Sequence, residues 1–109
     1  MQADWDALAE SFRALGDRTR LRILAMLKVE ELCVCELVEA LGISQPAVSQ
    51  HMRRLKQAGW VKERRRGQWV FYSLDGSAHS FRDQVLEALP DVREAVEQLR
   101  RNGRRAVCE

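Results

Sequence analysis

Over the first 42 residues of the chain, apolar side chains recur three and four positions apart, which is the period of an α-helix. Either Asp4 or Asp6 can cap a first helix that ends at Gly16, and Asp17 begins a second. A third helix is predicted in the segment that closes at Gly42, because glycine readily takes the left-handed conformation that ends a helix. The apolar faces of the three helices consist of Leu8, Phe12 and Leu15, then Leu21, Leu24, Ala25 and Leu27, and finally Leu37, Val38 and Leu41.

A fourth helix is predicted after only a short turn. Ser44 can act as its N-cap, and Pro46 falls in the first turn, where a backbone N–H is not needed. Helical spacing then continues up to Gly59, at Ala47, Val48, His51, Met52, Leu55 and Ala58. Two short helices joined by residues 42–44 have the form of a helix-turn-helix.

The pattern changes beyond Gly59. Residues 60–64 and 69–74 are rich in β-branched and aromatic side chains, and Gly67 lies between them, which predicts a hairpin. Because an isolated hairpin is marginal in water, it is expected to pack on the helices as a wing. Helical spacing returns from about Ser77, and Pro90 either kinks or splits this last helical segment. We therefore predict one mainly α winged helix-turn-helix domain over residues 1–109, with a two-stranded β wing and a loose tail over residues 100–109.

Composition supports a single folded domain. The 109 residues are 46% hydrophobic and include only 6 Gly and 2 Pro, which excludes a disordered or fibrous chain. The longest apolar run is far shorter than the roughly 18 residues that cross a bilayer, and the first residues are acidic where a secretory signal would be basic. A cytoplasmic protein without a membrane partner is expected. An enzyme is not expected, because carboxylate pairs, nucleophile–base sets and Gly-rich phosphate loops are absent at usable spacing.

Charge is distributed unevenly along the chain. The net charge is only +2, but residues 43–74 carry seven Lys and Arg residues against a single acid. A basic segment of this kind, placed on a helix-turn-helix and its wing, favours contact with double-stranded DNA. In such a motif the second helix enters the major groove. We assign base contacts to Gln45, Ser49 and Gln50, since glutamine can pair with adenine, and backbone contacts to Arg53 and Arg54.

The wing adds a second group of DNA candidates. Arg64, Arg65, Arg66 and Gln68 surround the predicted turn, within reach of a neighbouring minor groove or its phosphates. A merely solvated arginine loop is the alternative. His51 is a further candidate for a DNA contact, although its place among apolar helix positions favours a half-buried structural histidine.

Two cysteines stand two residues apart, at Cys33 and Cys35. The chain has three cysteines, so reduced thiols are expected rather than a disulfide framework. Soft thiolates select thiophilic ions, but side chains two apart on a regular helix do not face each other. Both sulfurs can therefore reach one ion only if Cys33 lies outside the helix or the first turn loosens. A position at a helix N-terminus is also expected to lower a thiol pKa. The alternative is a pair of small buried apolar residues.

Three stretches together resemble the ArsR/SmtB family of regulators. Residues 12–24 are similar to its entry into the second helix, residues 31–37 to the metal-binding box of its arsenic repressors, and residues 44–55 to its recognition helix. The resemblance, which covers residues 5–75, implies a homodimeric winged-helix repressor paired through its first and last helices. It also implies release from operator DNA when As(III) or Sb(III) binds to Cys33 and Cys35.

The family's best-known arsenic box has a third cysteine where this chain has Val38. Because trivalent arsenic usually takes three thiolates, Cys108 of the same or the partner subunit is a candidate third ligand. Binding by two thiolates and a small exogenous ligand is also open. The alternatives are a redox or persulfide sensor, a Cd/Pb sensor, which the lack of any cysteine before Cys33 disfavours, and an interaction module without DNA affinity.

Overall fold

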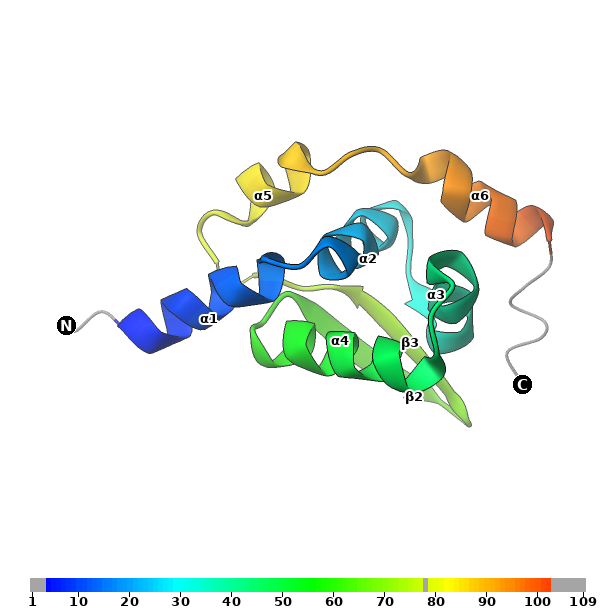
Figure 1. Cartoon of the computed structure of the whole chain (residues 1–109), viewed down its shortest axis with the longest axis horizontal. Helices are drawn as coiled ribbons and strands as arrows, with labels where there is room; N and C mark the ends of the chain where they lie inside the picture. The colour runs from blue at the N-terminus through cyan, green and yellow to red at the C-terminus, as the bar shows by residue number, and fades with distance from the viewer. Residues whose placement is uncertain (1–3, 78, 103–109) are drawn as a thin grey trace.

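The computed structural model describes residues 4–77 and 79–102, so the candidate ligand Cys108 lies outside the described residues. Six helices and three strands follow one another in this part of the chain (Figure 1): α1 Trp5–Leu15, α2 Arg18–Val29, β1 Leu32–Cys33, α3 Val34–Leu41, α4 Gln45–Gln57, β2 Val61–Arg66, β3 Trp69–Leu74, α5 Arg82–Ala88 and α6 Arg93–Arg101. The prediction of a mainly helical winged helix-turn-helix is confirmed.

Side-chain caps begin three of the helices where the sequence places them. Asp4 accepts a hydrogen bond from the backbone N–H of the third residue after it, at 3.0 Å, and so does Asp17 at the start of α2. Ser44 caps α4 in the same way, at 3.2 Å. Gly42 ends α3 at φ 68°, the left-handed conformation that glycine adopts without steric cost. The turn between α3 and α4 is therefore set by local chemistry.

The wing belongs to a sheet of three strands rather than two. The strand order is β1-β3-β2, and Leu32 and Cys33 of β1 pair with Tyr72 and Phe71 of β3. A two-residue strand is too short to produce a visible alternation of polar and apolar positions, so the sequence pattern gave no sign of it. The arginines of the wing also differ from expectation. Arg64, Arg65 and Arg66 lie in β2, and the turn itself is formed by residues 67–68.

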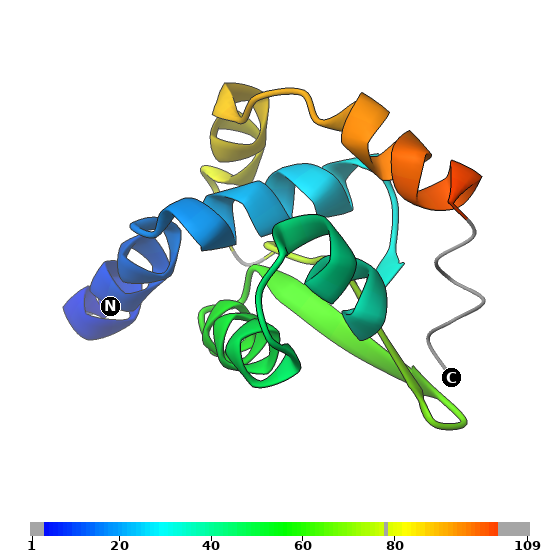
Figure 2. The same cartoon turned by 45° about the vertical axis from the view of Figure 1, so that its right-hand side comes forward.

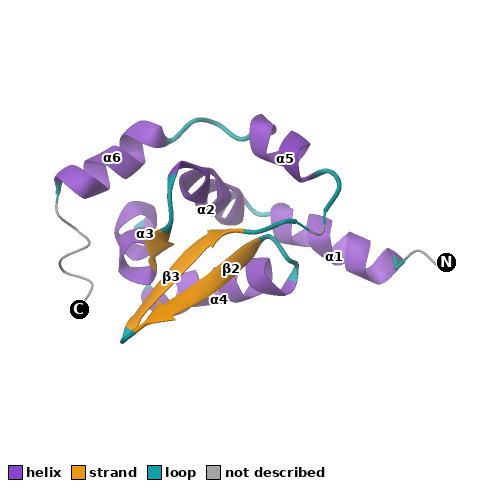
Figure 3. Ribbon diagram, turned by 180° about the vertical axis from the view of Figure 1, so that it is seen from behind, coloured by secondary structure: helices purple, strands orange, loops and turns teal. Residues whose placement is uncertain are grey.

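Helix α2 lies at the centre of the molecule. Its residues from Ile23 to Leu27 are all buried, with α5 and α6 on one side of it and α4 on the other (Figure 1). The sheet packs against α4, as seen from behind in Figure 3. Trp60 joins the wing to this core, because its ring is 1% exposed and its Nε1–H donates to the carbonyl of Ser11 at 3.0 Å. The core therefore holds α4 and the wing in one fixed arrangement.

The last helical segment is split at Pro90. Helix α5 ends at Ala88 and α6 begins at Arg93, which settles the choice between a kink and a break. The predicted loose tail begins too early, since Arg100 and Arg101 complete α6. None of the helices in residues 4–77 and 79–102 has the length and apolar character needed to cross a bilayer.

Candidate functional site

The two cysteines of the Cys-x-Cys pair lie at the junction of β1 and α3. Cys33 ends β1 and is the N-cap of α3 in extended conformation, at φ −89° and ψ 165°, while Cys35 is in the first turn of the helix. Their Sγ atoms are 3.5 Å apart. A zinc ion with Zn–S bonds of about 2.3 Å holds two sulfurs roughly 3.8 Å apart. Cys33 therefore lies outside the helix, which is one of the two arrangements that allow joint binding, and the distance between the sulfurs is close to the spacing that one ion imposes.

The backbone of Cys33 is hydrogen-bonded to a buried carboxylate, that of Glu36. Glu36 is fully buried and its Oε1 accepts a 2.9 Å hydrogen bond from the backbone N–H of Cys33, which forms a capping box at the start of α3. The other oxygen of Glu36 accepts from Nη1 of Arg100, in α6. Arg100 also binds Glu30, with its Nε 3.0 Å from Glu30 Oε2. The loop that carries Cys33 is thus tied to the last helix by an ion-pair network.

The expectation of a lowered thiol pKa is wrong for Cys33. Its side chain is 2% exposed, and this burial raises the pKa of the thiol above its ordinary value. The carboxylate of Glu36 acts in the same direction, whereas the backbone N–H groups of Glu36 and Cys35 act against it. A helix N-terminus lowers a thiol pKa only when the thiol stays solvated enough for that field to exceed the cost of desolvation. Cys33 is therefore held as a thiol in the folded protein.

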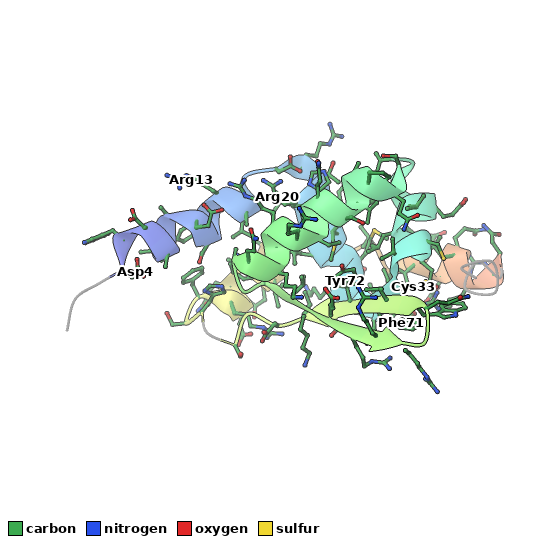
Figure 4. All side chains as sticks on the ribbon, turned by 90° about the horizontal axis from the view of Figure 1, so that it is seen from below. Asp4, Arg13, Arg20, Cys33, Phe71 and Tyr72 are labelled. Carbon is green, nitrogen blue, oxygen red and sulfur yellow. The ribbon has the colours of Figure 1, made fainter. Side chains whose placement is uncertain are left out.

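A cavity of about 220 Å³ opens beside the two sulfurs. Its walls come from three elements: the start of α3, the first residue of α4, and the wing strand β3 with the turn before it. The lining residues are Cys33, Val34, Cys35, Val38, Gln45, Gln68, Trp69 and Val70. Figure 4 shows Cys33 beside Phe71 of β3, toward the end of the molecule opposite Asp4 and Arg13. The cysteine pair thus shares a cavity with two residues, Gln45 and Gln68, that we assign to DNA contact.

The expectation of reduced thiols is wrong for Cys35, which is disulfide-bonded, whereas Cys33 carries a buried thiol. Within residues 4–77 and 79–102, no group of three or more His, Cys, Asp or Glu side chains is placed to hold an ion. Val38, at the position of the family's third cysteine, lines the cavity one turn beyond Cys35.

Helix α4 presents most of its predicted DNA contacts to solvent. Gln45, Gln50, Arg53 and Arg54 are exposed, and Ser49 is half-buried. The opposite side of the helix is anchored in the core through the fully buried Val48, Met52 and Leu55. Although Arg54 is exposed, its charge is paired within the protein, because its Nε lies 3.2 Å from Oε1 of Glu10 in α1.

The structure places His51 against the junction of α1 and α2. Its Nδ1 is 3.3 Å from Nη1 of Arg20 and 4.0 Å from Oδ1 of Asp17, and its side chain is 22% exposed. Arg20 is itself held by the carbonyls of Ala14, at 2.6 Å, and Arg13, at 3.2 Å. These contacts favour the reading of His51 as a structural residue that fixes α4 on the helices behind it.

The three arginines of the wing are in different environments. Arg64 donates to both carboxylate oxygens of Glu31, at 2.7 and 3.2 Å, and its guanidinium lies 5.1 Å from the ring centre of Phe71. This pairing raises the pKa of Arg64. Arg65 has a longer ion pair, 3.6 Å from Glu63, and Arg66 is exposed beside the turn that extends beyond the helices (Figure 2). The ion pair that Arg64 makes within the protein is therefore shorter, and has more hydrogen bonds, than the ion pair of Arg65.

Three residues of this region were not singled out by the sequence pattern: Glu36, Arg100 and Glu31. Glu36 had a local signal, since a glutamate three residues after an N-cap is half of a capping box, but Cys33 is an unusual residue for that cap. The partners Arg100 and Arg64 lie 64 and 33 residues from the acids they bind, so their pairing carries no local signal.

A helix-turn-helix whose second helix presents polar and basic side chains, with a basic wing beside it, defines a DNA-binding transcriptional regulator rather than an enzyme. Residues 17–63 match the family described as "Bacterial regulatory protein, arsR family". Over 81 residues the chain is 43% identical to the arsenic resistance transcriptional regulator ArsR1 of Pseudomonas putida, which covers 73% of this chain and 63% of that relative.

Two further comparisons extend over most of the chain. It is 37% identical over 99 residues to the arsenical resistance operon repressor of Escherichia coli, which covers 89% of this chain and 85% of that protein. The structure of HlyU from Vibrio cholerae matches with a TM-score of 0.64 and 32% identity, over 94% of this chain and 97% of that one. The chain belongs to the ArsR family of transcriptional regulators.

Proposed function

We propose that this ArsR-family regulator is a repressor that binds operator DNA as a homodimer and is released when As(III) or Sb(III) binds to Cys33 and Cys35. The observation that carries the proposal is the 3.5 Å contact between the two sulfurs inside a cavity that also includes Gln45 of α4. Relatives named as arsenic resistance regulators, in Pseudomonas putida and Escherichia coli, support the choice of inducer. Thiolate sulfur also prefers such soft ions.

The coupling to DNA follows from the walls of the cavity. An ion bound by both sulfurs fixes Cys33 and the first turn of α3 in one arrangement, and Gln45 and Gln68 line the same cavity. The first residue of α4 and the tip of the wing therefore move relative to each other when the cavity fills. Linkage requires DNA to weaken inducer binding by the same factor by which inducer weakens DNA binding.

The apolar surface of α1 supports the homodimer. Trp5 is 74% exposed, Phe12 51% and Leu8 41%, and these are large side chains to leave in water. They share α1, one of the two terminal helices through which the family resemblance implies pairing. A second copy of the chain that covers α1 would bury them and set two α4 helices on one operator.

The test is a DNA-binding titration under reducing conditions with arsenite, antimonite, cadmium and zinc. We expect arsenite and antimonite to release the wild-type protein, and Cys33→Ser and Cys35→Ser to bind DNA but ignore both ions. Cys108→Ser determines whether a third protein sulfur contributes. Release of the two variants by arsenite would remove the thiol site, and release that needs an oxidant and ignores arsenite would establish the redox-sensor alternative instead.

A further inference from the structure

One carboxylate lies between α4 and the wing. Glu63 of β2 is the single acid among residues 43–74, the segment that contains both of these elements. We propose that Glu63 is a positioning residue for DNA binding: it holds Lys56 of α4 and Arg65 of β2 between the helix and the wing, and it limits the attraction of these two cations to the phosphates of any duplex. The inference rests on the DNA binding that is part of the proposed function.

Glu63 makes an ion pair with α4 and another within its own strand. Its Oε1 accepts a hydrogen bond from Nζ of Lys56 at 3.0 Å, and its Oε2 lies 3.6 Å from Nε of Arg65. The side chain of Glu63 is 22% exposed, whereas those of Lys56 and Arg65 are 52% and 70% exposed. The carboxylate is therefore the more buried partner in both pairs, and the two cations remain accessible to a ligand.

The register of the sheet explains why Glu63 faces α4. Glu63 pairs with Tyr72 across the two strands, and Arg65 pairs with Val70. Residues that are paired in this way project to the same face of a sheet. Tyr72 belongs to the hydrophobic core that includes Leu55 of α4, and Val70 packs against that core. The wing arginines on either side of Arg65 project to the opposite face, because side chains alternate along a strand.

The side chain of Tyr72 is influenced by the same charges. Burial raises the pKa of Tyr72, and the carboxylate of Glu63 acts in the same direction, whereas Arg65 and Arg53 act against it. Arg53 is an exposed residue of α4. Together with Lys56, two cations of α4 and one of β2 therefore lie in the neighbourhood of Glu63 and Tyr72.

A DNA strand has to cross this space if α4 and the wing bind as we assign them. Helix α4 enters a major groove and the wing reaches the neighbouring minor groove, and a sugar–phosphate backbone separates these two grooves. Lys56 follows Ser49 by seven positions and Arg53 by three, so these three residues share one face of α4. Since Ser49 is assigned to a base and Arg53 to the backbone, we add Lys56 to the predicted phosphate contacts.

A carboxylate at this place weakens the attraction between the protein and DNA. Contacts to phosphate do not depend on sequence, and each cation that neutralises a phosphate releases counterions from the duplex. A cation that is already neutralised by a carboxylate contributes less to this release, and the carboxylate itself repels phosphate. Glu63 is therefore expected to reduce both the sequence-independent affinity for DNA and its dependence on salt.

The experiment measures the affinity for a fluorescently labelled duplex of arbitrary sequence, at salt concentrations between about 50 and 200 mM. Glu63→Gln keeps the size of the side chain and removes its charge. We expect this variant to steepen the slope of log affinity against log salt by about 0.9 to 1.8, for one or two additional phosphate contacts. Its affinity relative to the wild-type protein should then be about 3 to 12 times larger at 50 mM than at 200 mM salt. Glu63→Asp keeps the charge and should keep the wild-type slope.

Further variants separate the ion pairs from general effects of charge and fold. Glu87→Gln, at an exposed position of α5, changes the net charge by the same amount and should leave the slope unchanged. Lys56→Gln should reduce the slope by about 0.9 in the Glu63→Gln background and by much less in the wild-type protein, where Glu63 already neutralises the lysine. The midpoint of urea unfolding should change little in Glu63→Gln, since exposed ion pairs add little to stability.

The role of Glu63 would be overturned by equal slopes in Glu63→Gln and the wild-type protein, by an equal change in Glu87→Gln, by a change in Glu63→Asp that matches that in Glu63→Gln, or by an effect of Lys56→Gln that is the same in both backgrounds. Release of the wild-type protein from operator DNA by arsenite would leave the proposed function intact in each case. A wild-type protein that binds DNA but ignores arsenite would contradict the proposed function and not the role of Glu63. A wild-type protein without affinity for any duplex would contradict both.

Discussion

The backbone N–H of Cys33 donates a 2.9 Å hydrogen bond to the fully buried carboxylate of Glu36. The same carboxylate is paired with Arg100 of α6, so one side chain joins the candidate inducer site to the last helix of the chain. An inducer that binds Cys33 and shifts its backbone would change the geometry of this hydrogen bond. The pairing with α6 then provides a route by which the state of the site reaches the helix that the family resemblance places at the subunit interface.

Removal of the charge on Glu36 tests this connection. We expect Glu36→Gln to lower the free energy of unfolding by about 2 kcal/mol, because a hydrogen-bonded charge pair is lost while Arg100 keeps Glu30 as a partner. Urea unfolding measures the change. Glu39→Gln, on the exposed side of the same helix, is the matched control and should cost less than about 1 kcal/mol. If the two variants lose the same free energy of unfolding, the buried ion-pair network does not stabilise the fold more than an exposed carboxylate does.

The raised pKa of Cys33 predicts a dependence of stability on pH. In the unfolded chain the thiol ionises near its ordinary pKa of 9.0, whereas the folded protein holds on to the proton to higher pH. The contribution of this thiol to stability is therefore fully present below pH 9.0, and it declines as the pH rises through 9.0 toward the raised value. Urea unfolding of the wild-type protein and Cys33→Ser, under reducing conditions across this range, isolates the effect. A difference that stays constant with pH would contradict it.

The wing arginines should differ in their effect on DNA binding. Arg66→Ala removes an exposed cation, and if that cation contacts one phosphate, the slope of log affinity against log salt should fall by about 0.9. Arg64→Ala should change the slope much less, because Glu31 already neutralises that guanidinium. Titrations of operator DNA at several salt concentrations compare the two. A larger change in slope for Arg64 would mean that it leaves Glu31 for DNA in the complex.

The exposed apolar side chains of α1 predict the behaviour of the protein in solution. Trp5→Ala combined with Leu8→Glu should shift the protein from dimer to monomer and weaken operator binding. The reason is that the dimer would have to bury the new carboxylate among apolar side chains, with no partner for its charge. Analytical ultracentrifugation measures the oligomeric state. Gln50→Ala, on the exposed side of α4, should keep the wild-type oligomeric state and is the control for the ultracentrifugation alone, because Gln50 is itself a predicted DNA contact. A double variant that remains dimeric would place the subunit contact elsewhere.

Local signals in the sequence predicted most of the helices and the turn of the DNA-binding motif. Asp4, Asp17 and Ser44 cap their helices, and Gly42 ends α3, because each feature depends on hydrogen bonds and backbone angles within a few residues. The Cys-x-Cys spacing, together with the geometry of a helix, left two arrangements in which both sulfurs could reach one ion: Cys33 outside α3, or a loosened first turn. The structure has the first, with Cys33 as the N-cap.

The tertiary structure decided what surrounds the two sulfurs. Burial by the core raised the pKa of Cys33 against the expectation from its place at a helix end. The pairing of β1 with β3 brought the wing to the cysteines, and Arg100 and Glu36 met across 64 residues of chain. Caps and helical periods are properties of neighbouring residues, whereas burial, strand pairing and distant ion pairs depend on how the whole chain packs. The order of the residues therefore determined which groups are candidates to bind an ion. The packing of the fold determined the spacing of the two sulfurs, the protonation of Cys33 and the cavity that the sulfurs share with α4 and the wing.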